Sequence, residues 1–221
     1  DVRGFAGIAR QIQAGELPNT VVGNYDMDDL EFTPSDHGTA CAIVIHRVVP
    51  DAELFVAYYD GTDSAFLDAL EFFADNDVDI VSYSGGSSVG PRDGTWGQAV
   101  WVNEFVQDTG TLWVNSAGNE ALAHSMWYFN PGDDGWHDFG GGEYWMPFQA
   151  NGFFTMVALN WNGAWDGGEE SFFRFTVQDD FGNEVAFASE PKSGRRNDFP
   201  YQFTAFETEP GATYYLAIQG G

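Results

Sequence analysis

Short apolar runs alternate with longer segments of helical period in the first half of the chain. The runs are TVVGNY (20–25), ELFVAYY (53–59), DIVSYS (79–84) and TLWVNS (111–116), nearly continuously apolar as strands buried on both faces should be. Between them, apolar residues recur every three or four positions around 40–48, 66–73 and 100–106. This alternation predicts parallel pairing through right-handed crossovers, and therefore an α/β fold with a doubly wound parallel sheet.

After residue 128 the pattern changes twice. A Gly/Asp-rich stretch, NPGDDGWHDFGGGEYW (130–145), precedes three segments of alternating apolar and polar residues with turn residues at Gly182-Asn183 and Pro210-Gly211. We therefore expect three parts: an α/β core over 1–128, a connector over 129–144, and a small antiparallel β-sandwich over 145–221.

The net charge of the chain limits the kinds of molecule that it can bind. The chain of 221 residues has 34 acidic and 8 basic side chains, a formal net charge of -26, so its surface repels phosphate backbones and anionic lipid. We expect no nucleic-acid partner, and no apolar run is long enough for membrane insertion. An acidic surface of this kind suits a saline or extracellular setting. Cys41 is the single cysteine, and its apolar neighbours favour a packed thiol.

Two polar residues, His37 and Asn119, are candidates for a functional site. Both come after predicted strands, and ligands bind beyond the carboxyl ends of parallel strands. His37 opens a helix, and the small Gly38 and Thr39 beside it leave room for a reacting group; alternatively it is a satisfied cap histidine. Asn119 follows the strand 111–116 in a Gly-Asn turn, where its amide either donates to a developing oxyanion or is an ordinary turn residue.

Three motifs in this order resemble the subtilases, the subtilisin-like serine peptidases: HGT at 37–39, SYSGG at 82–86 and VNSAGNE at 114–120. The resemblance covers about residues 35–120. It implies a serine endopeptidase acting on peptide or protein substrates, with His37 as general base and Asn119 as oxyanion donor. It also implies secretion and assigns Ser84, Gly85 and Gly86 to the strand edge along which a peptide pairs.

The acidic partner of His37 has several candidates. Subtilases carry it in a D-x-G-type turn, and DVRGFAG at the start of the chain resembles that turn with one extra residue before the glycine, which makes Asp1 the first candidate. Asp26, Asp28 and Asp29 are rivals because they follow the strand-like run VVGNY. Asp36 is a weaker rival, since adjacent side chains do not readily converge on one ring.

The nucleophile is missing from the expected pattern. No G-T-S-x-A-x-P segment follows Asn119, and Ser87 and Ser88 follow the wrong strand to act as nucleophile. Some bacterial and archaeal subtilases resemble this chain further, with a histidine (here His124), a DGWHDF-like segment (here 134–139) and a β-sandwich before the serine. The resemblance implies that the serine lies beyond Gly221. The alternative is a non-catalytic pseudopeptidase that binds peptide or glycan.

A metal site and a sugar-binding site are less favoured interpretations of the sequence. We expect no cofactor. Four carboxylates of the connector could ligate calcium, although their spacing does not match a D-x-D-x-D-G loop. These residues are Asp133, Asp134, Asp138 and Glu143. The histidines show no zinc-ligand spacing with a cysteine pair. Trp161 and Trp165 either stack on sugar rings or, more often for such residues, pack within the sandwich.

Overall fold

The chain folds into two compact units in the computed structural model. The first unit comprises residues 1–86 and 94–121, and the second comprises residues 87–93 and 122–221. The described residues are 1, 4–18, 21–22, 35–87, 89–91, 93–118, 123–164, 171–188 and 199–220, and the side chains of residues 21, 22 and 133 are not described.

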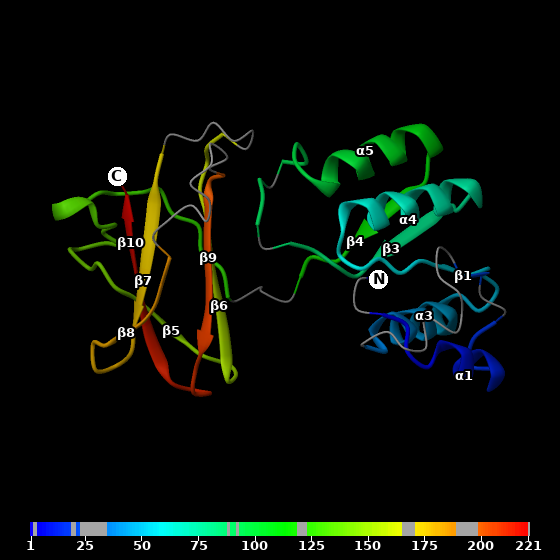
Figure 1. Ribbon diagram of the computed structural model, residues 1–221, viewed down its shortest axis with the longest axis horizontal. Helices are drawn as coiled ribbons and strands as arrows, with labels where there is room; N and C mark the ends of the chain where they lie inside the picture. The colour runs from blue at the N-terminus through cyan, green and yellow to red at the C-terminus, as the bar shows by residue number, and fades with distance from the viewer. Residues whose placement is uncertain are drawn as a thin grey trace. The chain divides into compact units, whose positions relative to one another are not determined.

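The first unit alternates helices with short parallel strands (Figure 1). Its elements are α1 (Ile8–Gln13), β1 (Val21–Val22), α3 (His37–Val48), β2 (Phe55–Val56), α4 (Asp63–Asp75), β3 (Ile80–Tyr83), α5 (Gln98–Thr109) and β4 (Leu112–Asn115). β1 pairs in parallel with β2, and β3 pairs in parallel with β4. The α/β character predicted from the sequence is confirmed, and the described strands form two separate parallel pairs.

Two hydrophobic clusters hold the first unit together. One joins α1, α3 and β2, and the other joins α4, α5, β3 and β4. The first is built on Phe5, Ile8, Leu17, Ala42, Leu54 and Val56, and the second on Tyr59, Ala65, Phe66, Leu70, Val81 and Phe105. In the second cluster the ring of Phe66 contacts Tyr59, Tyr83, Trp101 and Trp113, so α4 fixes the position of both strands through one aromatic side chain.

The second unit is built from antiparallel strands. The strands are β5 (Met146–Gln149), β6 (Phe154–Asn160), β7 (Phe173–Gln178), β8 (Glu184–Ala188), β9 (Tyr201–Glu207) and β10 (Thr213–Gly220). They form one four-stranded sheet in the order β5-β10-β7-β8 and a two-stranded sheet of β6 and β9. A common core joins the two sheets: Phe175, Val177 and Leu216 come from the first, and Phe206, Val157 and Leu159 come from the second.

The two turns predicted from glycine behave differently. Gly182-Asn183 closes the hairpin between β7 and β8, where Gly182 has a φ of 79° and Asp179 accepts the backbone N–H of Phe181 and of Asn183. Pro210-Gly211 instead carries the chain from one sheet to the other, because β9 pairs with β6 whereas β10 pairs with β5 and β7.

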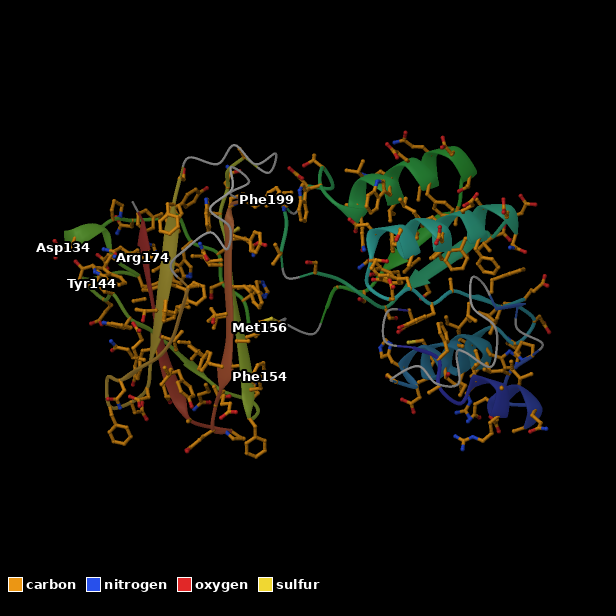
Figure 2. All side chains as sticks on the ribbon, in the orientation of Figure 1. Asp134, Tyr144, Phe154, Met156, Arg174 and Phe199 are labelled. Atoms are coloured by element: carbon orange, nitrogen blue, oxygen red, sulfur yellow. The ribbon has the colours of Figure 1, made fainter. Side chains whose placement is uncertain are left out.

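The connector packs onto the last strand of the second unit around a buried histidine. His137 donates its backbone N–H to the carbonyl of Ile218 in β10, and its ring Nδ1 accepts the N–H of Asn130. His137 is 3% exposed and its ring lies against Phe129 and Phe139, and the ring Nε2 has no partner among the described residues. Nearby, Gln219 accepts a hydrogen bond from Arg174 and donates one to the carbonyl of Asp134 in the short 3-10 turn η1 (Asp133–Gly135). Figure 2 labels Arg174 and Asp134 in the second unit.

Candidate active site

The backbone of Asp1 pairs with the segment that follows β2. The Asp1 nitrogen donates to the carbonyl of Ala57 at 2.6 Å, and its carbonyl accepts the N–H of Tyr59 at 3.3 Å. Bonding to both neighbours of one residue on the adjacent segment is the pattern of a parallel ladder. Asp1 therefore lies beside the carboxyl end of β2, the edge where polar groups of parallel sheets meet.

A turn from Asp1 to Gly4 accommodates the extra residue seen in the sequence. The N–H of Gly4 donates to Asp1 Oδ1 at 3.2 Å, and Gly4 has a φ of 123°, which favours glycine. The carbonyl of Gly4 then accepts the N–H of Gly38 at 2.8 Å. The turn thus ties the acidic residue directly to the first turn of α3.

His37 is the first residue of α3, and close packing fixes the helix start around it. Its N–H donates to Ser35 Oγ, and the hydroxyl of Thr39 donates to the carbonyl of Ala6. A Cβ at Gly38 would lie 2.6 Å from the ring of Phe5, so only glycine allows the 4–6 segment to lie this close. These contacts explain the HGT sequence. Gly38 leaves space for the 4–6 segment, and Thr39 forms a hydrogen bond to it.

The two side chains meet in a short hydrogen bond. Asp1 Oδ2 lies 2.6 Å from His37 Nδ1, with the aspartate side chain 8% exposed and the imidazole 32% exposed. A carboxylate accepts at this position, so the neutral ring carries its proton on Nδ1 and leaves Nε2 as a base. Nε2 has no hydrogen-bond partner in the described part of the chain. This arrangement can accept a proton from a nucleophile at Nε2.

Cys41 lies one helical turn after His37 on α3. Its thiol, the ring of His37 and the carboxylate of Asp1 each offer one ligand atom within 4.8 Å, and they form the single cluster of this kind among the described residues. The hydrogen bond between Asp1 and His37 accounts for the closeness of two of these three atoms. Cys41 itself is half-buried and has no disulfide partner.

The predicted substrate segment follows β3 directly. Ser84 and Gly86 are exposed and Gly85 is half-buried. The hydroxyls of Tyr83 and Tyr59 lie 2.5 Å apart, and burial, followed by the hydrogen bond to Tyr83, raises the pKa of Tyr59 above its ordinary value. Because the N–H of Tyr59 bonds to Asp1, this tyrosine pair connects the end of β3 to the Asp1–His37 pair.

The structure does not describe several of the predicted residues. Asn119 falls outside the described residues, as do Asp26, Asp28, Asp29, Ser88 and Trp165. Asp36 is exposed at the N-cap of α3. The hydroxyl of Ser87 forms a local turn with the backbone of Val89.

Two further predictions concern the second unit. Asp138 Oδ1 accepts the N–H groups of Gly140 and Gly142, so this oxygen stabilises the glycine turn of the connector. Trp161 packs against Phe173, with ring centroids 5.2 Å apart, and its Nε1 is buried without a partner among the described residues.

A family comparison identifies the class of protein. The model of the subtilase family, Peptidase_S8, matches residues 16–167, more than half of the chain. The chain belongs to the subtilase family. The match includes His37, the 84–86 segment and Asn119, begins after Asp1, and continues into the second unit. No curated protein and no solved structure matches the chain. No described helix is long and apolar enough to cross a membrane.

Sequence reasoning missed three features of this region. The tyrosine pair joins residues 24 positions apart, and the side chains of Asn115 and Ser116 bond to the carbonyl of Gly85, some 30 positions earlier. Neither contact has a local signal in the sequence, because both depend on how β2, β3 and β4 are placed. The third feature is the hydrogen bond from Gly4 to Asp1, which follows from a glycine conformation.

Proposed function

We propose that the protein is a subtilisin-like serine endopeptidase in which Asp1 orients His37 as the general base. The observation that carries this proposal is the 2.6 Å contact between Asp1 Oδ2 and His37 Nδ1 at the start of α3, in a chain of the subtilase family. A buried carboxylate on Nδ1 fixes the ring orientation and stabilises the imidazolium that forms during reaction.

The proposed reaction is acyl transfer to water. A serine hydroxyl attacks the scissile carbonyl while His37 Nε2 takes its proton, and the same proton passes to the leaving amine as the peptide C–N bond breaks. Water then attacks the acyl-serine while His37 accepts its proton. The ester C–O bond breaks, the proton passes from His37 to the serine oxygen, and the carboxylic acid product is released. The side-chain amide of Asn119 donates to the oxyanion at each tetrahedral stage.

The serine belongs, in this proposal, to a part of the whole protein outside these 221 residues. Support comes from the face of β3 and β4 opposite α4 and α5, where three apolar side chains are exposed: Ile80 at 61%, Leu112 at 57% and Val114 at 49%. A doubly wound sheet is covered on both faces. Further segments that cover this face and supply the nucleophile would complete both the sheet and the triad.

The second unit, in the same proposal, is a small β-sandwich inserted in the peptidase. Its two antiparallel sheets share one core, and the family match continues into it. We also propose that the protein acts outside the cell, since a formal charge of -26 is best tolerated where salt screens self-repulsion.

The test is to treat the whole natural protein with a fluorophosphonate probe and to map the labelled residue by mass spectrometry. We expect a labelled serine outside residues 1–221, with labelling lost in His37→Ala and strongly slowed in Asp1→Asn. His46→Ala is the matched control, because His46 lies nine residues further along the same helix. Absence of labelling in the folded protein would instead favour a pseudopeptidase that binds peptide or glycan.

A further inference from the structure

The carbonyl of Gly85, in the middle of the predicted substrate segment, is already bonded within the protein. Asn115 Nδ2 donates to it at 3.1 Å, and the hydroxyl of Ser116 donates at 3.2 Å. A carbonyl oxygen has two lone pairs, so both acceptor positions of Gly85 are occupied by side chains from the end of β4. A peptide substrate that used this carbonyl would have to displace one of them.

These two bonds extend the pairing of β3 with β4. The last backbone bond of the ladder runs from the N–H of Ser116 to the carbonyl of Tyr83 at 3.0 Å. Carbonyls two residues apart in an extended chain point to the same side, so Tyr83 and Gly85 both face β4. Ser84 lies between them and is exposed. Because successive residues of an extended chain direct their backbone groups to opposite edges, we expect the N–H and C=O of Ser84 to face away from β4.

Trp113 fixes the orientation of the Asn115 amide. Its indole Nε1 donates to Asn115 Oδ1 at 3.3 Å, which assigns that atom as oxygen and leaves the Nδ2 hydrogens for other acceptors. Nδ2 donates to the carbonyls of Gly85 and Ser116. Each polar atom of the Asn115 amide therefore has a partner, and its role as donor to Gly85 is defined.

The ring of Tyr83 also lies close to Gly85. A Cβ at Gly85 would lie 2.7 Å from Cζ of Tyr83 and 2.8 Å from its hydroxyl oxygen. The hydroxyl of Tyr83 is in turn bonded to that of Tyr59, which restricts movement of the ring. Gly85 is thus restrained by an aromatic ring and by two side-chain donors.

We propose that Asn115 and Ser116 are positioning residues of the peptidase: they hold the Gly85 carbonyl against β4, so that Ser84, rather than Gly85, presents its backbone to an extended peptide substrate. This inference rests on the proposed function. It assigns the pairing of the substrate to one residue of the 84–86 segment and gives β4 a role in recognition.

The experiment compares two substrates of the whole protein, a single-residue ester and a peptide amide with several residues before the scissile bond. In the double variant Asn115→Ala/Ser116→Ala, kcat/KM for the extended substrate should fall by about tenfold relative to the ester, as expected for losing the net contribution of two hydrogen bonds. The loss should appear as a higher KM for the extended substrate. Ser116→Thr keeps the hydroxyl, so its loss in kcat/KM for the extended substrate should be smaller than that of Ser116→Ala.

Asn103→Ala is the matched control. Asn103, on α5, also donates its Nδ2 to a glycine carbonyl of the first unit, that of Gly94 at 3.2 Å. The Asn103→Ala substitution removes the same type of hydrogen bond at a different glycine. It should therefore leave the ratio of kcat/KM for the two substrates unchanged.

The outcomes separate this inference from the proposed function. An unchanged ratio of the two kcat/KM values in the double variant would overturn the inference alone. An equal loss on both substrates would also overturn it, because the pair would then act on the reaction itself and not on pairing with the extended substrate. Failure of the unsubstituted protein to hydrolyse either substrate or to react with a fluorophosphonate would overturn the proposed function, and this inference with it.

Discussion

At the residue scale, the carboxylate of Asp1 decides which nitrogen of His37 carries a proton. It accepts from Nδ1 at 2.6 Å and is itself nearly buried, held by the N–H of Gly4 and by backbone pairing with 57–59. A residue that accepted poorly at Nδ1 would allow the proton to move to Nε2, and the ring would then lose its basic atom on the exposed side.

Asp1→Asn should therefore lower kcat of the whole protein on the order of 10³- to 10⁴-fold, with KM nearly unchanged, because the asparagine favours the wrong tautomer without changing the shape of the site. Steady-state kinetics measure this effect. Asp36→Asn is the control, since Asp36 adjoins His37 in sequence but is exposed at the N-cap of α3. Equal losses in the two variants would contradict the assignment of Asp1.

His137 provides a second test at this scale. Burial lowers the pKa of His137 below its ordinary value of 6.5, against a smaller opposing effect of Asp138. As the pH falls below about 6.5, the unfolded state binds a proton that the folded state does not, so stability decreases until the folded pKa is reached. We expect the melting temperature to drop between about pH 7.5 and 5 and to drop less steeply in His137→Gln.

The exposed His124 gives the matched control for that measurement. His124→Gln should leave the pH dependence of the melting temperature as it is in the unsubstituted protein. If His137→Gln and His124→Gln show the same slope, acid destabilisation arises from other groups.

The choice among acidic residues shows what the sequence could and could not predict at the site. HGT located His37 at a helix start, but the extra residue in DVRG left Asp26, Asp28 and Asp29 as rivals. In the structure, Asp1 lies beside His37. Gly4 adopts a positive φ, which favours glycine, and donates its N–H to the carboxylate of Asp1. Such a turn depends on backbone geometry that residue types alone do not specify.

At the element scale, helix α4 begins with a side-chain cap. Thr62 Oγ1 accepts the N–H of Ala65 at 3.3 Å, and Asp60 Oδ1 accepts from both the N–H and the hydroxyl of Thr62. α4 carries Phe66, the ring that contacts β3 and β4, so the cap stabilises the helix on which that strand pair packs.

Thr62→Ala should lower the free energy of unfolding by about 1 kcal/mol, the usual cost of losing an N-cap hydroxyl. Thr62→Ser keeps the hydroxyl and should cost much less. Denaturant unfolding monitored by tryptophan fluorescence measures both. A loss of the same size in the two variants would mean that the methyl group, rather than the cap, is responsible.

The order of elements was predicted better than their pairing. Each of the four apolar runs of the first unit contains a strand, because such runs need no distant information. β5 was missed because MPFQ is short and contains Pro147, which a strand at the edge of a sheet tolerates. The short α1 was also missed, although Ile8 is fully buried, since one turn and a half of helix gives almost no periodic signal.

At the scale of the whole molecule, charge is the dominant property. With a formal net charge of -26 and only two ion pairs among the described residues, one of them Arg47–Glu16 on the surface, mutual repulsion of carboxylates opposes folding. Raising NaCl from about 0.05 M to about 1 M should increase the melting temperature by several degrees, because the screening length shortens from well over 10 Å to about 3 Å.

Sodium sulfate at equal ionic strength should raise the melting temperature further, since sulfate also strengthens apolar burial. Sucrose tests the alternative that exclusion of solutes alone accounts for the change. If NaCl leaves the melting temperature constant while sucrose raises it, charge repulsion does not limit the stability of this protein.

The chain enters the second unit twice, first for residues 87–93 and then from residue 122 onward. Within that unit, the buried Gly90 donates its N–H to Asn160 Oδ1 at 3.3 Å, at the end of β6. No single cut of the polypeptide can separate the units without leaving this loop attached to the wrong fragment. Expression of the first unit alone would therefore require a new linker in place of 87–93, and expression of the second unit alone would require one in place of 94–121. A gene cut once near residue 122 would deprive the strand unit of seven of its own residues.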